Sequence, residues 1–108
     1  MARIDLDGVI REPNPALIER SGYSHDEIVG RHMRDFADEG SLASVNHLVD
    51  ELQRGSVAEC NVGLRARGGE IVARRCAVLP SVVDGNLTGG FLVILDISEQ
   101  VQAEQFMR

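Results

Sequence analysis

The stretch AECNVGLR, residues 58 to 65, alternates apolar and polar side chains. A period of two is typical of a β-strand that buries one face and exposes the other. After turn residues at 68–69 the pattern predicts a second strand over residues 71–83, and after a turn at 84–86 a third strand over residues 87–96. The third strand contains the run FLVIL, which is apolar on both faces and therefore indicates a central strand.

The N-terminal segment predicts a β-hairpin. Two short segments, residues 3–6 and 9–12, flank the dipeptide Asp7-Gly8. Asp-Gly between apolar runs is the strongest short-range hairpin signal, because Gly tolerates the positive φ that the turn requires. The chain is therefore expected to open with two antiparallel strands.

Helix signals occupy the segment between these two strand regions. Residues 14–22 predict a helix that an Asn caps, a Pro begins and a Gly ends. Residues 24–30 predict a short helix with a Ser–Glu capping box, and residues 33–37 predict one more turn. Residues 41–54 predict a longer helix whose apolar stripe has a period of about 3.6 residues. The stripe consists of Leu42, Val45, Leu48, Val49 and Leu52.

The order of elements is two strands, several helices, three strands and a terminal helix. Because the helices and strands are segregated along the chain, we predict an α+β fold with one antiparallel sheet and helices packed on one face. Residues 1–108 suit a single domain, and residues 97–108 predict the start of a C-terminal linker helix.

Composition and charge exclude several classes of protein. The formal net charge is −6 and there is no clustered basic stripe, which argues against nucleic-acid binding. No apolar run reaches membrane-spanning length, so we expect no membrane contact by this domain. Cys60 and Cys76 have no other Cys or His at metal-ligand spacing, which excludes the common zinc patterns. The N-terminus also lacks a signal-peptide pattern, and we expect a cytoplasmic setting.

Four strings occur in the order and spacing of a known family. They are DGVI at residues 7–10, NPA at 14–16, GYSHDEIVG at 22–30 and GFLVILDISE at 90–99. Together they resemble a PAS domain, and the resemblance covers nearly the whole chain. Gly68-Gly69 replaces the family's usual Asp-Gly turn, and a Ser replaces the usual Thr of the last string. Both changes keep the turn or capping chemistry.

For this sequence, the resemblance implies a five-stranded antiparallel sheet with spatial order 2-1-5-4-3. It also implies helices that enclose a pocket on one face of the sheet. It also implies a sensory module and not an enzyme. The module would belong to a bacterial or archaeal signal-transduction protein, such as the sensor histidine kinase of a two-component system. Its partner would be an effector domain in the same chain, and the implied fold is compatible with a homodimer. The signal output would run through Asp96, Ile97, Ser98 and Glu99.

Strand alternation and the helix stripe predict which residues would face the pocket. These are Val45, Val49, Ala58, Cys60, Val62, Arg74, Cys76, Val78, Leu92 and Ile94. They form either a plainly packed core, which is the simpler interpretation, or the wall of a small-ligand cavity. Arg74 shares the parity of its apolar neighbours, and an inward Arg would suit a carboxylate. A bulge or twist that turns Arg74 outward is nevertheless the arrangement we expect.

The two cysteines are expected to lie opposite each other if both face inward. A redox pair is then one interpretation, and packing as small apolar side chains is the one we favour.

The sequence disfavours haem and flavin as cofactors. His47, on the long helix, lies about 160° from the centre of the apolar stripe and should face water rather than bind haem. His25 and His32 are also expected at the surface. Flavin photochemistry in the family needs a Cys that residues 34–40 do not provide, and the chain has no Trp. We therefore expect either no cofactor or a small organic metabolite.

Two alternative functions stay open from the sequence. One is a haem or flavin sensor of redox state or gas with unusual ligation. The other is a small stand-alone enzyme, which the sequence favours less because it shows no Ser-His-Asp arrangement, no phosphate loop and no metal cluster.

Overall fold

A computed structural model describes residues 1–96 of the protein. Within this range the strands are β1 (Ala2–Ile4), β2 (Ile10–Pro13), β3 (Ala58–Arg65), β4 (Ile71–Val83) and β5 (Asn86–Asp96). The α-helices are α1 (Pro15–Ser21), α2 (His25–Ile28) and α3 (Leu42–Gln53). Two 3-10 helices, η1 (Met33–Phe36) and η2 (Glu39–Ser41), precede α3. The predicted linker helix over residues 97–108 lies outside the described residues.

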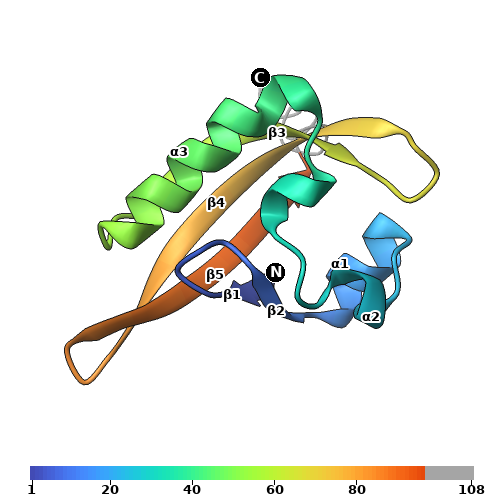
Figure 1. The fold of residues 1–108 in the computed structure, drawn as a ribbon. Coiled ribbons are helices and arrows are strands. Elements are labelled where there is room, and N and C mark those ends of the chain that lie inside the picture. The colour runs from blue at the N-terminus through green and yellow to red at the C-terminus, as the bar shows by residue number, and fades with distance from the viewer. Residues whose placement is uncertain (97–108) are drawn as a thin grey trace, which may run out of the picture.

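The five strands form one antiparallel sheet in the order β2-β1-β5-β4-β3, which confirms the predicted α+β fold and strand order. β5 is the central strand, as its apolar run predicted. Figure 1 shows α3 running alongside β4, while α1 and α2 lie near β2. The helices thus cover one face of the sheet in two separate groups.

The turn between β4 and β5 is a two-residue hairpin loop. Val83 pairs with Asn86, and Asp84 and Gly85 between them have φ values of 51° and 80°. Two successive positive φ values are what a type I′ turn requires, and Asp-Gly suits them. The predicted turn at 84–86 is confirmed, although Asn86 already belongs to β5.

The first hairpin has a longer loop than the sequence predicts. β1 ends at Ile4, and Ile4 pairs with Ile10, so residues 5–9 form the loop. The Asp5 carboxylate organises this loop, because its Oδ1 accepts the backbone N–H groups of Asp7 and Val9, each at 3.0 Å. Arg11 donates to Oδ2 of Asp5 through Nε and Nη2, at 3.1 and 2.8 Å. A capped loop therefore replaces the expected two-residue turn.

Replacing Asp5 with Asn is expected to lower the unfolding free energy at pH 7 by about 1 kcal/mol. Partial burial of the Asp5 carboxyl opposes ionisation, but the N–H of Val9, the guanidinium of Arg11 and the N–H of Asp7 outweigh it and lower its pKa. A lowered carboxyl pKa adds stability above the unfolded-state pKa, and this stability is lost as the pH falls through the folded-state value.

Urea unfolding between pH 3 and pH 7 measures this difference. The difference in unfolding free energy between the native protein and D5N should become smaller as the pH falls. D7N is the control, because it removes the same charge from the same loop at an exposed side chain that forms no hydrogen bond with the residues in the described range. A difference in unfolding free energy that does not depend on pH would mean that the Asp5 carboxylate does not stabilise the loop.

The first two helices have the predicted caps. Oδ1 of Asn14 accepts the N–H of Leu17 at 2.9 Å, and Gly22 ends α1 with φ of 80°. At α2, the Ser24 hydroxyl accepts the N–H of Glu27, and the Glu27 carboxylate accepts the N–H of Ser24. The predicted capping box is confirmed. These caps position two short helices beside β2.

α3 buries one stripe against the sheet. Val45, Leu48 and Leu52 are buried, and Leu52 is fully inaccessible to solvent. They pack in the same cluster as Val62 of β3 and Val78 of β4. Leu42 was predicted in this stripe but is 38% exposed, because it is the first residue of the helix. The core under α3 therefore combines residues of the helix with residues of β3 and β4.

The described residues contain no helix that is long and apolar enough to cross a membrane.

Candidate functional site

A cavity of about 180 Å³ lies between the short N-terminal helices and the sheet. The sheet contributes Ile10, Leu64, Val72, Leu92 and Ile94 to its wall, and the helical segment contributes Leu17, Tyr23, Ile28, Met33 and Phe36. Arg20, Arg65 and Arg74 also line it. Arg20 and Arg65 are exposed, so the cavity opens to solvent on their side. Its chemistry is that of an apolar pocket with cationic groups.

The helical wall is built from one face of α1 and two aromatic side chains. Ala16 and Arg20, and likewise Leu17 and Ser21, are four residues apart, and all four line the cavity. Residues at this spacing share a helix face. The rings of Tyr23 and Phe36 meet edge to face, with centroids 5.1 Å apart and planes at 65°. This aromatic pair forms the part of the wall near the connection between α1 and α2.

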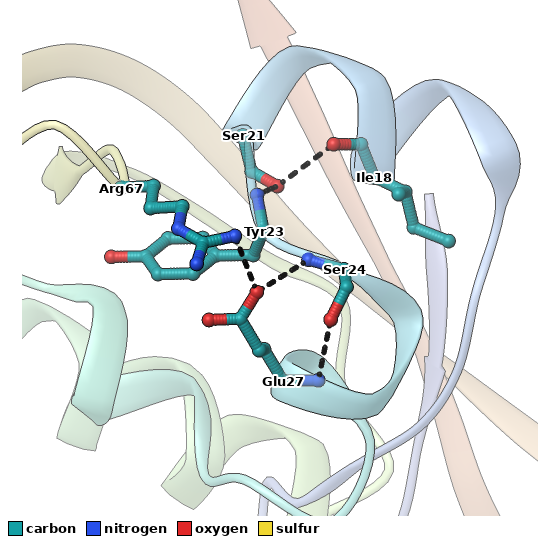
Figure 2. Close-up of polar contacts among 6 residues, drawn as sticks. All are labelled: Ile18, Ser21, Tyr23, Ser24, Glu27 and Arg67. Carbon is teal, nitrogen blue, oxygen red and sulfur yellow. Dashed lines mark hydrogen bonds and ion pairs between the residues drawn. The ribbon is translucent and has the colours of Figure 1, made fainter.

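The corner between α1 and α2 is tied to the β3–β4 turn. Arg67 of this turn donates through Nη1 to Oε1 of Glu27 at 2.8 Å, and its backbone N–H donates to the Ser21 carbonyl at 3.2 Å. The Tyr23 hydroxyl donates to the Arg65 carbonyl at 3.3 Å. Figure 2 shows Arg67 and Ser24 meeting at Glu27 beside the Tyr23 ring.

The contacts at this corner are solvent-exposed. The side chains of Arg67 and Glu27 are 60% and 39% exposed. The N–H of Ser24, its hydroxyl and the nearby Arg67 and Arg31 lower the pKa of Glu27, so this carboxyl is ionised at neutral pH. Exposed ion pairs of this kind contribute only about 0–1 kcal/mol, so the Arg67–Glu27 pair adds little to the stability of the corner.

Together with Arg65 at the end of β3, Arg74 is a charged member of the sheet wall. It lines the cavity together with Val72, its neighbour of the same parity on β4. The expected outward orientation is wrong. β4 keeps an unbroken register with β3 and β5 through Arg74, and the irregularity in its pairing falls between Ser81 and Val82. Because the bulge comes seven residues later, it does not change the parity at Arg74.

Comparison with protein-family models identifies the chain. The PAS domain model matches residues 1–99. The chain belongs to the PAS domain family. PAS domains are generally regulatory sensor domains and not enzymes.

Solved structures share the fold of this PAS domain at low sequence identity. A PAS domain from Colwellia psychrerythraea is 16% identical, with a TM-score of 0.78 over 91% of this chain and 85% of that chain. The PAS domain of an HTR-like protein from Haloarcula marismortui is 22% identical, with a TM-score of 0.69 over 86% and 80%. The Cycle PAS-B domain of Drosophila melanogaster is 9% identical, with a TM-score of 0.73 over 87% and 97%. No curated protein sequence matches the chain.

The residues predicted to face the pocket fall into two groups in this PAS domain. Arg74, Leu92 and Ile94 line the cavity. The other predicted residues are Val45, Val49, Ala58, Cys60, Val62, Cys76 and Val78, which belong to the core cluster or pack against it. Val45 and Val49 belong to the apolar stripe of α3, and the other five lie on β3 and β4 beneath this helix. The cavity is displaced to the other end of the sheet, where the shorter helices cover it.

The helical wall of the cavity was not anticipated from the sequence. Leu17, Tyr23, Ile28, Met33 and Phe36 line it, yet none of them was proposed as a site residue. One signal was available, because Tyr23 and Phe36 are large aromatic residues in or beside very short helices. Short helices present few side chains in register, so large residues are needed to bridge the gap to the sheet.

The two cysteines of this PAS domain lie opposite each other on neighbouring strands. Cys60 of β3 lies opposite Cys76 of β4, as predicted for inward-facing residues, and both are free thiols. Burial raises the pKa of Cys60, and burial together with the nearby Cys60 thiol raises the pKa of Cys76 to about 12. Thiols with raised pKa values are poor nucleophiles at neutral pH. This chemistry favours packing over a reactive role.

The histidines occupy capping or surface positions. His47 is exposed on α3 and His25 is exposed on α2, as predicted. His32 is half-buried rather than at the surface, because its Nδ1 caps η1 by accepting the N–H of Arg34 at 3.0 Å. Within residues 1–96, no group of three or more His, Cys, Asp or Glu side chains is arranged to hold a metal ion.

Proposed function

We propose that this PAS domain binds a small, largely apolar molecule in the cavity and relays its presence through the chain that follows β5. The observation that carries the proposal is the position of β5. Leu92 and Ile94 line the cavity, and the same strand ends at Asp96, the first residue of the predicted output segment. A ligand that contacts β5 therefore acts close to the exit of the domain.

The size of the cavity supports a small ligand. A dry cavity of about 150 Å³ accommodates benzene in another protein, so about 180 Å³ suits a ring-sized molecule. A ligand that binds only the folded state also raises the stability of that state. The Cycle PAS-B domain is described with bound ethylene glycol, which supports small-molecule binding in the family.

The relay we propose uses the pairing of β4 with β5. Arg74 of the cavity wall is the register partner of Asp96, and Cys76 is that of Ile94. A ligand that binds one arrangement of these strand ends better than another shifts the population, by about 1–3 kcal/mol in typical cases. Asp96, Ile97, Ser98 and Glu99 would carry the shift to an effector domain. Of these, residues 97–99 lie outside the described range.

The proposal extends to the setting of the domain. We infer an effector in the same chain, as in a bacterial or archaeal sensor histidine kinase, in the cytoplasm. The family's regulatory role supports the effector, and the charge and cysteine content support the compartment.

The experiment is a titration of the purified domain with 2-phenylethanol, followed by ¹H–¹⁵N NMR. We expect saturable shifts at cavity residues and at residues 97–99. V72W fills the cavity and should abolish both sets of shifts. A73W, one residue along β4 on the exposed side, should retain them. Unchanged binding in V72W, or no saturable binding of 2-phenylethanol, 3-phenylpropanoate or its amide to the native domain, would contradict the proposal.

A further inference from the structure

We propose that the ligand is an organic anion, a carboxylate attached to an apolar body about the size of one ring. This inference rests on the proposed function, because it specifies what the cavity accepts. It follows from the charge of the cavity wall. Three arginines line the cavity, whereas no Asp or Glu is among the described residues that do so. The whole chain has the opposite balance, with 17 acidic residues against 11 basic residues.

Arg74 places a guanidinium on the sheet side. It is half-buried, and it follows Val72 in the alternation that faces the cavity. A guanidinium carries five N–H donors and binds a carboxylate through two parallel hydrogen bonds. Arg74 already takes part in an interaction within the protein. Five donors allow it to keep a protein partner and also bind one ligand carboxylate, so the inference does not need Arg74 to be free.

Arg20 places a second guanidinium on the helical side. It lies four residues after Ala16, and both residues line the cavity from the same face of α1. In the described part of the chain its side chain forms no ion pair or hydrogen bond. Arg20 and Arg74 thus approach the cavity from opposite walls. A carboxylate between them is attracted to both, whereas a cationic ligand is repelled by both.

The rest of the wall selects the body of the ligand. Apolar and aromatic side chains from the sheet and the short helices surround the space, and the Tyr23 hydroxyl already donates to a backbone carbonyl. A polyol or a dicarboxylate would leave hydroxyl or carboxylate groups against apolar side chains, which is costly. A ligand with one charged end and an apolar body places its carboxylate at the arginines and its body against the apolar side chains.

The test compares three compounds of similar shape: 3-phenylpropanoate, its amide and 2-phenylethanol. Calorimetry or NMR titration gives the dissociation constant of each for the purified domain. We expect the carboxylate to bind roughly ten- to one-hundredfold more tightly than the amide, as charged hydrogen bonds contribute. The carboxylate-to-amide affinity ratio should be smaller in 0.5 M salt, because salt partly screens the charges of the exposed Arg20 and Arg65.

Two variants assign the preference to the arginines. R74Q and R20Q should each reduce the carboxylate-to-amide affinity ratio at least threefold. R20Q changes an exposed residue of α1 and serves as the folded variant if R74Q is unstable. R75Q is the matched control, because Arg75 is the next residue on β4 and is paired with Glu59 outside the cavity. R75Q should leave the ratio unchanged.

The outcomes separate this inference from the proposed function. If the alcohol and amide bind but the carboxylate gains nothing, the domain is still a small-molecule sensor and the anion preference is wrong. If the ratio survives both R74Q and R20Q, Arg74 and Arg20 do not recognise the anion and the inference is overturned. If none of the three compounds binds, both the inference and the proposed function are contradicted.

Discussion

G89A is expected to lower the unfolding free energy by roughly 2–5 kcal/mol, because it adds a clash to a strained backbone. Gly89 lies in β5 with φ of +149°, a conformation that side-chain-bearing residues rarely adopt. A Cβ atom built there would lie 2.5 Å from the carbonyl oxygen of Ile4 and 3.3 Å from Cα of Asp5. Both contacts are with backbone, so no side chain can rotate away. The substitution should weaken the pairing of β1 with β5.

The control for this prediction is G68A in the β3–β4 turn. A Cβ at Gly68 would have no atom within 4 Å, and its φ is not in the positive range. G68A should therefore change stability by less than about 0.5 kcal/mol. Urea denaturation of the three proteins measures the difference. Equal midpoints for G89A and the native protein would show that the close approach of β1 to β5 is not as described.

L52A is expected to destabilise the domain by about 2–5 kcal/mol. Leu52 is fully inaccessible to solvent on α3, and its Cδ1 lies 2.6 Å from where a Cβ on Gly90 would be. The helix therefore sits directly on the central strand, and removing this side chain leaves a cavity between them. The loss includes both the transfer free energy of the deleted atoms and the unfilled space.

L42A provides a matched comparison on the same helix. Both residues belong to the apolar stripe predicted from the sequence, yet Leu42 is 38% exposed. L42A should cost less than about 1 kcal/mol. Thermal and urea unfolding of both variants test the comparison. A similar loss in the two variants would contradict the packing of α3 on β5.

The fold could be predicted because its signals are local. The alternation over residues 58–65 and the capping box at Ser24 each act within a few residues of chain. The central position of β5 follows from an apolar run within one strand. These features do not depend on knowing how distant segments pack, so periodicity and turn chemistry were sufficient to predict them.

The site could be predicted only in part, because it depends on how helices of unequal length cover the sheet. Alternation identified Leu92 and Ile94 as inward-facing, and both line the cavity. It could not show that α3 fills the space above Val62 and Val78 and leaves the other end open. The orientation of Arg74 depended on where β4 is irregular, which only the pairing with its neighbours reveals.

The central claim concerns where a small molecule binds. Intermolecular nuclear Overhauser effects between 3-phenylpropanoate and a domain with labelled methyl groups test it most directly. We predict contacts from the phenyl ring to methyl groups of Leu17, Leu92 and Ile94. Contacts to Val45 of α3 or to Val62 and Val78 beneath this helix, or the absence of any contact at saturating probe, would contradict the account.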